Sequence, residues 1–107
     1  MYENGADVVY AAAGGTGTGM HKAGSEAGKW SIGVDADEAT YPAHAAYTST
    51  ILTSMLKRVD VGVGAFVKDA LAGTPTAGVK VWGIAEGGVG YTTTGGYIDD
   101  ITSKLSL

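Results

Sequence analysis

Four of the six residues in the stretch GGTGTG, residues 14–19, are glycine, and this stretch directly follows a run of small apolar residues. Because glycine has no Cβ, its backbone N–H groups can approach a ligand closely, and loops of this kind hold phosphates or sugars. Two carboxylates follow in the stretch GVDAD, at Asp35 and Asp37, and each can accept charge-assisted hydrogen bonds from hydroxyl groups. The loop and the acids together predict a binding site for a phosphate, a sugar or a nucleoside.

The loop fits a Walker phosphate-binding motif incompletely. Gly14 and Gly19 have the spacing of that motif, but Met20 and His21 stand where its lysine and its serine or threonine belong. Without the lysine, the β- and γ-phosphates lose their main cation. The sequence therefore disfavours ATP hydrolysis.

A dinucleotide-binding fingerprint is also matched only in part. Gly15 and Gly17 supply its first two glycines and Asp35 lies at the expected distance, but Met20 replaces the third glycine. Two further interpretations stay open. In one, backbone N–H groups and a carboxylate hold a sugar or nucleoside without any phosphate; in the other, the glycines only form a tight strand-to-helix turn.

Hydrophobic patterning predicts the elements that position these residues. Residues 6–13 and 29–35 are short apolar runs typical of buried strands, and residues 18–27 between them predict a short helix that ends at Gly28. A strand, a glycine loop, a helix and a strand within about 30 residues indicate a βαβ unit with parallel strands. Ligands bind such sheets beyond the carboxyl ends of the strands, where Asp35 ends the second run.

The rest of the chain predicts further helices and one further strand. Residues 51–71 carry apolar side chains at the spacing of a long amphipathic helix, although part of this stretch also alternates like a strand. Residues 79–85 predict a third strand, and Ile98, Ile101 and Leu105 predict the apolar stripe of a terminal helix. We therefore expect an α/β fold: one Rossmann-like unit over residues 1–107, with a parallel sheet and flanking helices.

Composition argues against several classes of function. A net charge of −4 without a basic cluster disfavours nucleic-acid binding, and the absence of cysteine excludes disulfides and thiolate metal sites. No apolar run approaches the 18 residues of a membrane span. His21 and His44 lie far apart in the sequence without a clustered set of partners. We expect both on the surface, and we expect neither a metal site, a cofactor nor a Ser-His-Asp arrangement.

Four blocks in fixed order, GADVVYAAAGGTGTG, WSIGVDAD, LTSMLKRVDV and VKVWGIAEGGVGY, resemble the basic membrane protein family. Its members are purine-nucleoside-binding lipoproteins that deliver substrate to ABC transporters and have the type I periplasmic-binding-protein fold. The resemblance implies that Gly15 and Gly17 line a ligand cleft. It also implies that Asp35 binds ribose hydroxyls, with Asp37 as the alternative acid, and that Lys57 is a second ribose anchor.

The resemblance further implies where such a protein works. The family has two lobes, and this chain resembles the C-terminal portion of it, with a crossing between lobes expected after Asp37. It implies a lipoprotein anchored on the extracytoplasmic face of the cell membrane, with an ABC transporter permease as partner and without catalysis. The opening MYENGADVVY has no basic region of a signal peptide, so we expect any targeting segment outside this chain.

Two alternatives stay open beside that interpretation. One is an enzyme class: the nucleotide-binding, NAD-type half of an oxidoreductase, which would use Gly15, Gly17 and Asp35 for an adenosine ribose. The other concerns partners. A parallel sheet of three strands has open edges, and self-association of the chain would cover them.

Overall fold

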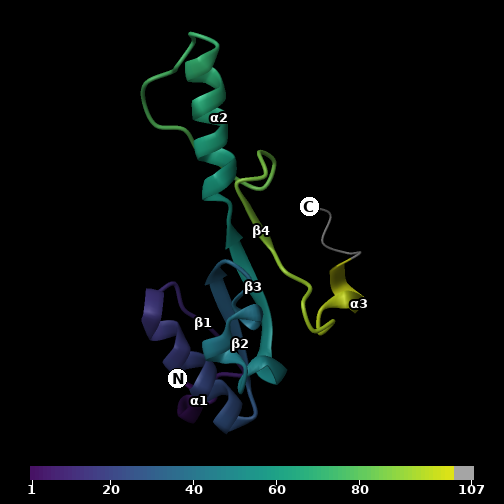
Figure 1. The fold of residues 1–107 in the computed structure, drawn as a ribbon. Helices are drawn as coiled ribbons and strands as arrows, with labels where there is room; N and C mark the ends of the chain where they lie inside the picture. Colours follow the sequence, from purple (N-terminus) through teal and green to yellow (C-terminus); the bar gives the residue numbers. More distant parts are fainter. Residues whose placement is uncertain (103–107) are drawn as a thin grey trace.

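The computed structural model describes residues 1–102 and contains one four-stranded sheet in the order β1-β2-β3-β4 (Figure 1). β1 (Val8–Tyr10), β2 (Trp30–Asp35) and β3 (Ile51–Lys57) are parallel, whereas β4 (Val89–Tyr91) pairs antiparallel with β3. A mostly parallel sheet with helices confirms the expected α/β class.

The predicted βαβ unit is present. α1 (Gly17–Ala27) connects β1 to β2 and packs against the sheet, and Gly28 ends it in the left-handed conformation with φ 64°. The first strand is shorter than the predicted residues 6–13, because the chain after Tyr10 turns into the short 3-10 helix η2 (Gly14–Thr16). The described chain has four other 3-10 helices: η1 (Tyr2–Asn4), η3 (Glu38–Thr40), η4 (Pro42–His44) and η5 (Thr48–Thr50).

The long helix predicted over residues 51–71 is wrong in its first part. Residues 51–57 form β3, and the helix α2 (Val59–Leu71) begins only after a break at Arg58. β3 lies between β2 and β4 and pairs with both, and its sequence, ILTSMLK, does not alternate cleanly between apolar and polar residues. A strand of this kind cannot be distinguished from a buried helix by periodicity.

The third strand predicted over residues 79–85 is also wrong. These residues form no strand in the structure, and Val79 and Val81 are 96% and 83% exposed. They lie beside α2, away from the sheet, where no strand is available for pairing (Figure 1). The strand that the sheet does gain is β4.

The terminal helix α3 (Asp99–Thr102) is short. Ile98 just before it is buried, whereas Leu105 lies outside the described residues.

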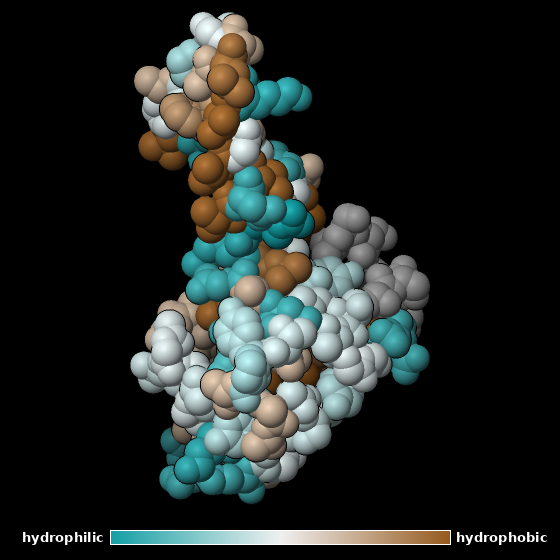
Figure 2. All heavy atoms as spheres, in the orientation of Figure 1, coloured by the Kyte–Doolittle hydropathy of each residue, from teal (hydrophilic) through white to brown (hydrophobic). Residues whose placement is uncertain are grey.

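α2 and the loop after it, residues 59–87, project beyond the carboxyl end of β3 and are called the arm below (Figure 1). The radius of gyration of 16.6 Å exceeds the value of about 13 Å for a compact chain of this length. None of the 13 residues of α2 is buried, and apolar side chains follow its surface (Figure 2). Those at least 49% exposed are Val59, Val63, Phe66, Val67 and Leu71.

The chain leaves the sheet later than expected. Residues 38–57 stay with β2, since β3 pairs with it, and the departure is at Arg58 instead of after Asp37. Within residues 1–102 no helix combines the length and the hydrophobicity needed to cross a membrane.

Candidate functional site

The carboxyl ends of the three parallel strands meet at one edge of the sheet. Tyr10 ends β1, Asp35 ends β2 and Lys57 ends β3. The register pairs Asp35 with Leu56, so Lys57 is the next residue along the neighbouring strand. Two of the predicted site residues are thus brought together by the pairing of β2 with β3.

Asp35 and Lys57 form an ion pair at this edge, with 2.7 Å between Oδ1 and Nζ. About half of each side chain is exposed, so a ligand can reach both groups. The hydrogen bond from Lys57 to Asp35, followed by the attraction of its charge, raises the pKa of Lys57 above its ordinary value. Lys57 therefore keeps its positive charge at neutral pH, as a donor to ligand hydroxyls requires.

The backbone at Asp35 has an uncommon conformation. Asp35 is the one non-glycine residue among residues 1–102 with a positive φ, 73°. The N–H of Ala36 donates to the carbonyl of Val34 at 2.9 Å, so Asp35 is the centre of a tight three-residue turn. Such a conformation costs about 1–3 kcal/mol and occurs preferentially at functional sites. The turn directs the Asp35 side chain out of the strand toward Lys57.

Asp37 is held differently from Asp35. Its Oδ2 accepts a hydrogen bond of 2.5 Å from the Thr94 hydroxyl, while its Oδ1 is buried without a hydrogen-bond partner in the part of the chain that the structure describes. The two acids of GVDAD therefore face different surroundings. Asp35 is paired with the predicted lysine, and Asp37 is attached to the segment after β4.

The two predicted glycines also differ. A Cβ on Gly15 would meet nothing within 4 Å, so this part of the loop is open to an approaching group. Gly17 begins α1 and is buried, and a Cβ on it would lie 3.8 Å from Oε2 of Glu38. Gly15 thus faces free space, whereas Gly17 faces the interior.

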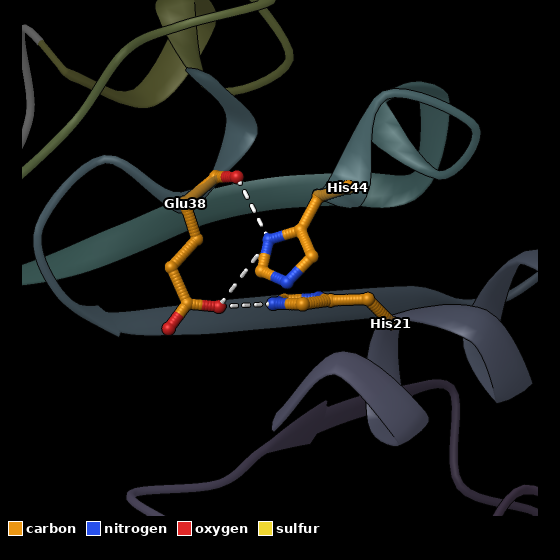
Figure 3. Close-up of side chains that lie close together, drawn as sticks. All are labelled: His21, Glu38 and His44. Carbon is orange, nitrogen blue, oxygen red and sulfur yellow. Dashed lines mark hydrogen bonds and ion pairs between the residues drawn. The ribbon is translucent and has the colours of Figure 1, made fainter. Parts of the chain in front are cut away.

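A buried cluster beneath the edge contradicts the expectation for the two histidines. His21 and His44 are 0% and 4% exposed, their ring centroids are 4.8 Å apart, and both contact Glu38 (Figure 3). His21 Nε2 donates to Glu38 Oε2 at 2.5 Å, and His44 Nδ1 lies 3.0 Å from the Glu38 backbone oxygen. We call His21, Glu38 and His44 the His–Glu–His cluster.

Sequence reasoning missed this cluster, but one signal pointed to it. His21 shares the buried face of α1 with Gly17 and Gly24, which are four residues before it and three after it. That spacing places the three residues on one side of a helix, and the two glycines allow that side to approach the sheet closely. The contacts to Glu38 and His44, by contrast, join separate elements.

A hollow of about 300 Å³ lies at the base of the arm. Lys57 lines it together with apolar side chains that include Val63 and Trp82. Two larger hollows, each of about 610 Å³, lie near the N-terminus around Met1, and neither is lined by a predicted site residue. Of these three hollows, the smallest is thus the one lined by a predicted site residue.

Comparison with known proteins gives a consistent family match. A family model described as ABC transporter substrate-binding protein PnrA-like (Bmp) matches residues 1–105. Two curated relatives, both named CD4+ T-cell-stimulating antigen, come from Listeria monocytogenes, at 37% identity, and Listeria innocua, at 36%. Each match covers 86% of this chain and 29% of the relative, so the chain spans less than a third of the length of these relatives.

Solved structures agree with this match. A solute-binding protein of an ABC transporter system from Aeropyrum pernix superposes with a TM-score of 0.69 at 35% identity, covering 97% of this chain and 29% of that chain. A transcriptional activator of the comK gene from Bacillus halodurans superposes with a TM-score of 0.72 at 23% identity, covering 95% of this chain and 36% of that chain. The second likeness concerns the fold alone.

Proposed function

Because the chain belongs to the PnrA-like (Bmp) family of ABC transporter substrate-binding proteins, we propose that it binds a purine nucleoside through the ribose and releases it unchanged. The observation that carries the proposal is the pair of Asp35 and Lys57, with 2.7 Å between their charged atoms at the carboxyl edge of the parallel strands. This is the edge at which open α/β sheets bind their ligands.

The chemistry of the pair suits two neighbouring hydroxyl groups. The carboxylate of Asp35 accepts hydrogen bonds from both ribose hydroxyls, and the ammonium group of Lys57 donates to a hydroxyl oxygen. In the free chain, each group holds the other at the edge, so little rearrangement is needed when the sugar arrives. A hydrogen bond to a charged group contributes about 1.5–3 kcal/mol, or about 10- to 150-fold in the dissociation constant.

The other expected site residues have supporting roles in this proposal. The open loop at Gly15 offers backbone N–H groups beside the sugar, and Gly17 fixes the start of α1. Asp37 is the alternative ribose acid, but its Oδ2 already accepts the Thr94 hydroxyl. None of these contacts needs a nucleophile or a proton-transfer step, so the proposed function is binding without catalysis.

The arm supports a place within a longer, two-lobed protein. Its apolar face lies outside the core of the sheet, and such a face is stable in water only when another surface covers it. We infer that the sheet belongs to one lobe, as the C-terminal portion of the protein, and that the arm packs against the other lobe. In this chain on its own, a second copy would cover the face by self-association.

The setting follows from the same family. A substrate-binding component works with an ABC transporter permease, and we place the parent protein on the extracytoplasmic face of the cell membrane, attached as a lipoprotein. The comparisons give no support to the NAD-type oxidoreductase alternative. NAD therefore serves as the control ligand below.

Calorimetric titration of this chain with inosine, and separately with NAD, tests the proposal. We expect heat of binding with inosine and none with NAD. Asp35→Asn should weaken inosine binding at least tenfold, because it removes the charge from the acceptor. Asp7→Asn is a matched control, since Asp7 forms an exposed ion pair with Lys29 (2.5 Å) at the amino edge of the sheet. Asp37→Asn distinguishes the two candidate acids.

Two results would refute the proposal. Absence of inosine binding by the folded chain would show that these residues do not form a nucleoside site. Equal dissociation constants for the unchanged chain and for Asp35→Asn would remove Asp35 from the site, and a loss with Asp37→Asn instead would assign the role to Asp37.

A further inference from the structure

We propose that the His–Glu–His cluster is a buried binding site for a zinc-like divalent cation. Glu38 is 6% exposed, and its two histidine neighbours are more buried still. One ligand atom from each residue lies within 4.8 Å of the other two (Figure 3). Two imidazoles and one carboxylate form a donor set that zinc uses in tetrahedral sites with one further position for water. This proposal is independent of the nucleoside site.

The outer nitrogen of each ring has a hydroxyl partner. His21 Nδ1 lies 2.7 Å from the Ser31 hydroxyl, which itself donates to the carbonyl of Thr50, and His44 Nε2 lies 2.9 Å from the Thr18 hydroxyl. Without a metal, the inner nitrogens face oxygens that only accept hydrogen bonds and therefore act as the donors. When a metal binds, the outer nitrogen of each ring would carry the proton and donate it to its hydroxyl partner, which leaves the inner nitrogen free for the metal. Such partners fix the tautomer of metal-binding histidines.

The carboxylate of Glu38 is also oriented to bind a cation through one of its two oxygens. Its Oε1 accepts the backbone N–H of Val34 at 3.3 Å, while Oε2 faces both imidazoles. The backbone N–H of Glu38 donates to the Ser54 hydroxyl at 3.1 Å, which holds the residue over the sheet. Oε2 is therefore the oxygen available to a cation.

The distances require only small movements of the side chains. Two ligand atoms bound to one zinc ion lie about 3.3 Å apart, given Zn–N and Zn–O bonds of about 2.0–2.1 Å. The contact of 2.5 Å between His21 and Glu38 must open, and the separation of 3.8 Å between His44 Nδ1 and Glu38 Oε2 must shorten, each by less than about 1 Å. The two histidine nitrogens lie within 4.8 Å of each other and must approach by up to about 1.5 Å. His44 Nδ1 would exchange its contact with the Glu38 backbone oxygen for the metal.

A metal in this place would join α1 to the connector between β2 and β3. His21 comes from α1, Glu38 from η3 and His44 from η4. The described contacts of η4 are mostly with α1 and η3, so the cation would hold η3 and η4 of the connector against α1. The predicted consequence is a chain whose thermal stability depends on zinc.

Thermal unfolding of the chelator-treated chain with Zn²⁺ or Mg²⁺ tests the site. We expect Zn²⁺, at about 100 times its dissociation constant, to raise the melting temperature by at least about 10 °C, because ligand binding to the folded state shifts unfolding. Mg²⁺ should have no effect, because it prefers oxygen ligands in octahedral geometry. Co²⁺ should bind with the intense visible absorption of a tetrahedral site.

Two variants and one control assign the effect. Glu38→Gln and His44→Gln should each weaken Zn²⁺ binding at least tenfold. Glu26→Gln removes an exposed acid of α1 that pairs with Lys22, and it should leave binding unchanged. Zn²⁺ binding that persists in both cluster variants would overturn the proposal, as would a folded, unchanged chain that gains no stability from Zn²⁺. If the variants fail to fold, the Co²⁺ spectrum of the unchanged chain tests the site. A weak band typical of octahedral Co²⁺ would exclude the His–Glu–His cluster as the binding site.

Discussion

Gly33 in β2 is packed so closely against the His–Glu–His cluster that a single added methyl group should destabilise the fold. An alanine Cβ at this position would lie 2.5 Å from the Ser54 hydroxyl oxygen and 2.9 Å from Cβ of Glu38. Both distances are below ordinary contact, so the neighbours must move. The φ of Gly33 lies outside the positive range, so the backbone itself accepts alanine, and the expected effect comes from packing.

The size of the expected destabilisation follows from the contacts with Ser54 and Glu38. Overpacking of a core costs about 1–3 kcal/mol, and displacement of the Ser54 hydroxyl, which accepts the N–H of Glu38 at 3.1 Å, adds about 1 kcal/mol. The higher strand propensity of alanine returns about 0.5–1 kcal/mol. We therefore expect Gly33→Ala to lower the free energy of unfolding by about 1–3.5 kcal/mol.

Urea unfolding followed by circular dichroism measures this change. Gly19→Ala is the control, because a Cβ at Gly19 in α1 meets nothing within 4 Å and should instead stabilise the helix by up to about 1 kcal/mol. Ser54→Ala in the Gly33→Ala background removes the shorter of the two contacts, so the combined loss should be smaller than the sum of the single losses. A Gly33→Ala chain within about 0.5 kcal/mol of the unchanged chain would refute the packing argument.

Two further predictions concern exposed groups. The pKa of Lys57 lies above its ordinary value of 10.5 because of Asp35, and Asp35→Asn should return it toward that value, as followed by NMR titration. Because the pKa of Lys57 is raised in the folded state, the ion pair stabilises the fold fully below the ordinary lysine pKa, and this stabilisation is lost as the pH rises through the folded-state pKa. Identical titration of Lys57 in the unchanged chain and in Asp35→Asn would show that the pair does not form in solution. The apolar face of the arm should make the chain self-associate, and Phe66→Ser together with Leu71→Ser should reduce that association in light scattering. A monomeric mass for the unchanged chain at every concentration would contradict this second prediction.

The βαβ unit could be predicted because its signals are local. The helix of residues 17–27 ends at a glycine that adopts the left-handed conformation, and the strand after it is a short apolar run bounded by polar residues. β3 could not be predicted in the same way. Its backbone pairs with β2 on one side and with β4, which lies more than 30 residues later in the chain, on the other, and this pairing exists only after the sheet has formed.

The candidate site shows the same division between local and long-range information. Asp35 follows from its position at the end of an apolar run, whereas Lys57 is predicted only through the family resemblance and lies in a stretch whose periodicity predicts a helix. Its approach to Asp35 depends on β3 being a strand in register with β2. The histidines were misjudged because the contact between His21 and Glu38 spans 17 residues and requires the helix, the sheet and the connector together.

The arm is attached to the sheet through two adjacent chain segments, one leaving at Arg58 and one returning at Gly88. The N–H of Arg58 donates to the carbonyl of Gly88 at 2.8 Å, so the two segments form a narrow ribbon that continues the pairing of β3 with β4. Such a ribbon flexes most easily perpendicular to its plane and resists being sheared within it. Because Lys57 is the last residue of β3 before this ribbon, flexing at the attachment would tilt its ammonium group relative to Asp35 and thereby tie the orientation of the arm to the geometry of the ion pair.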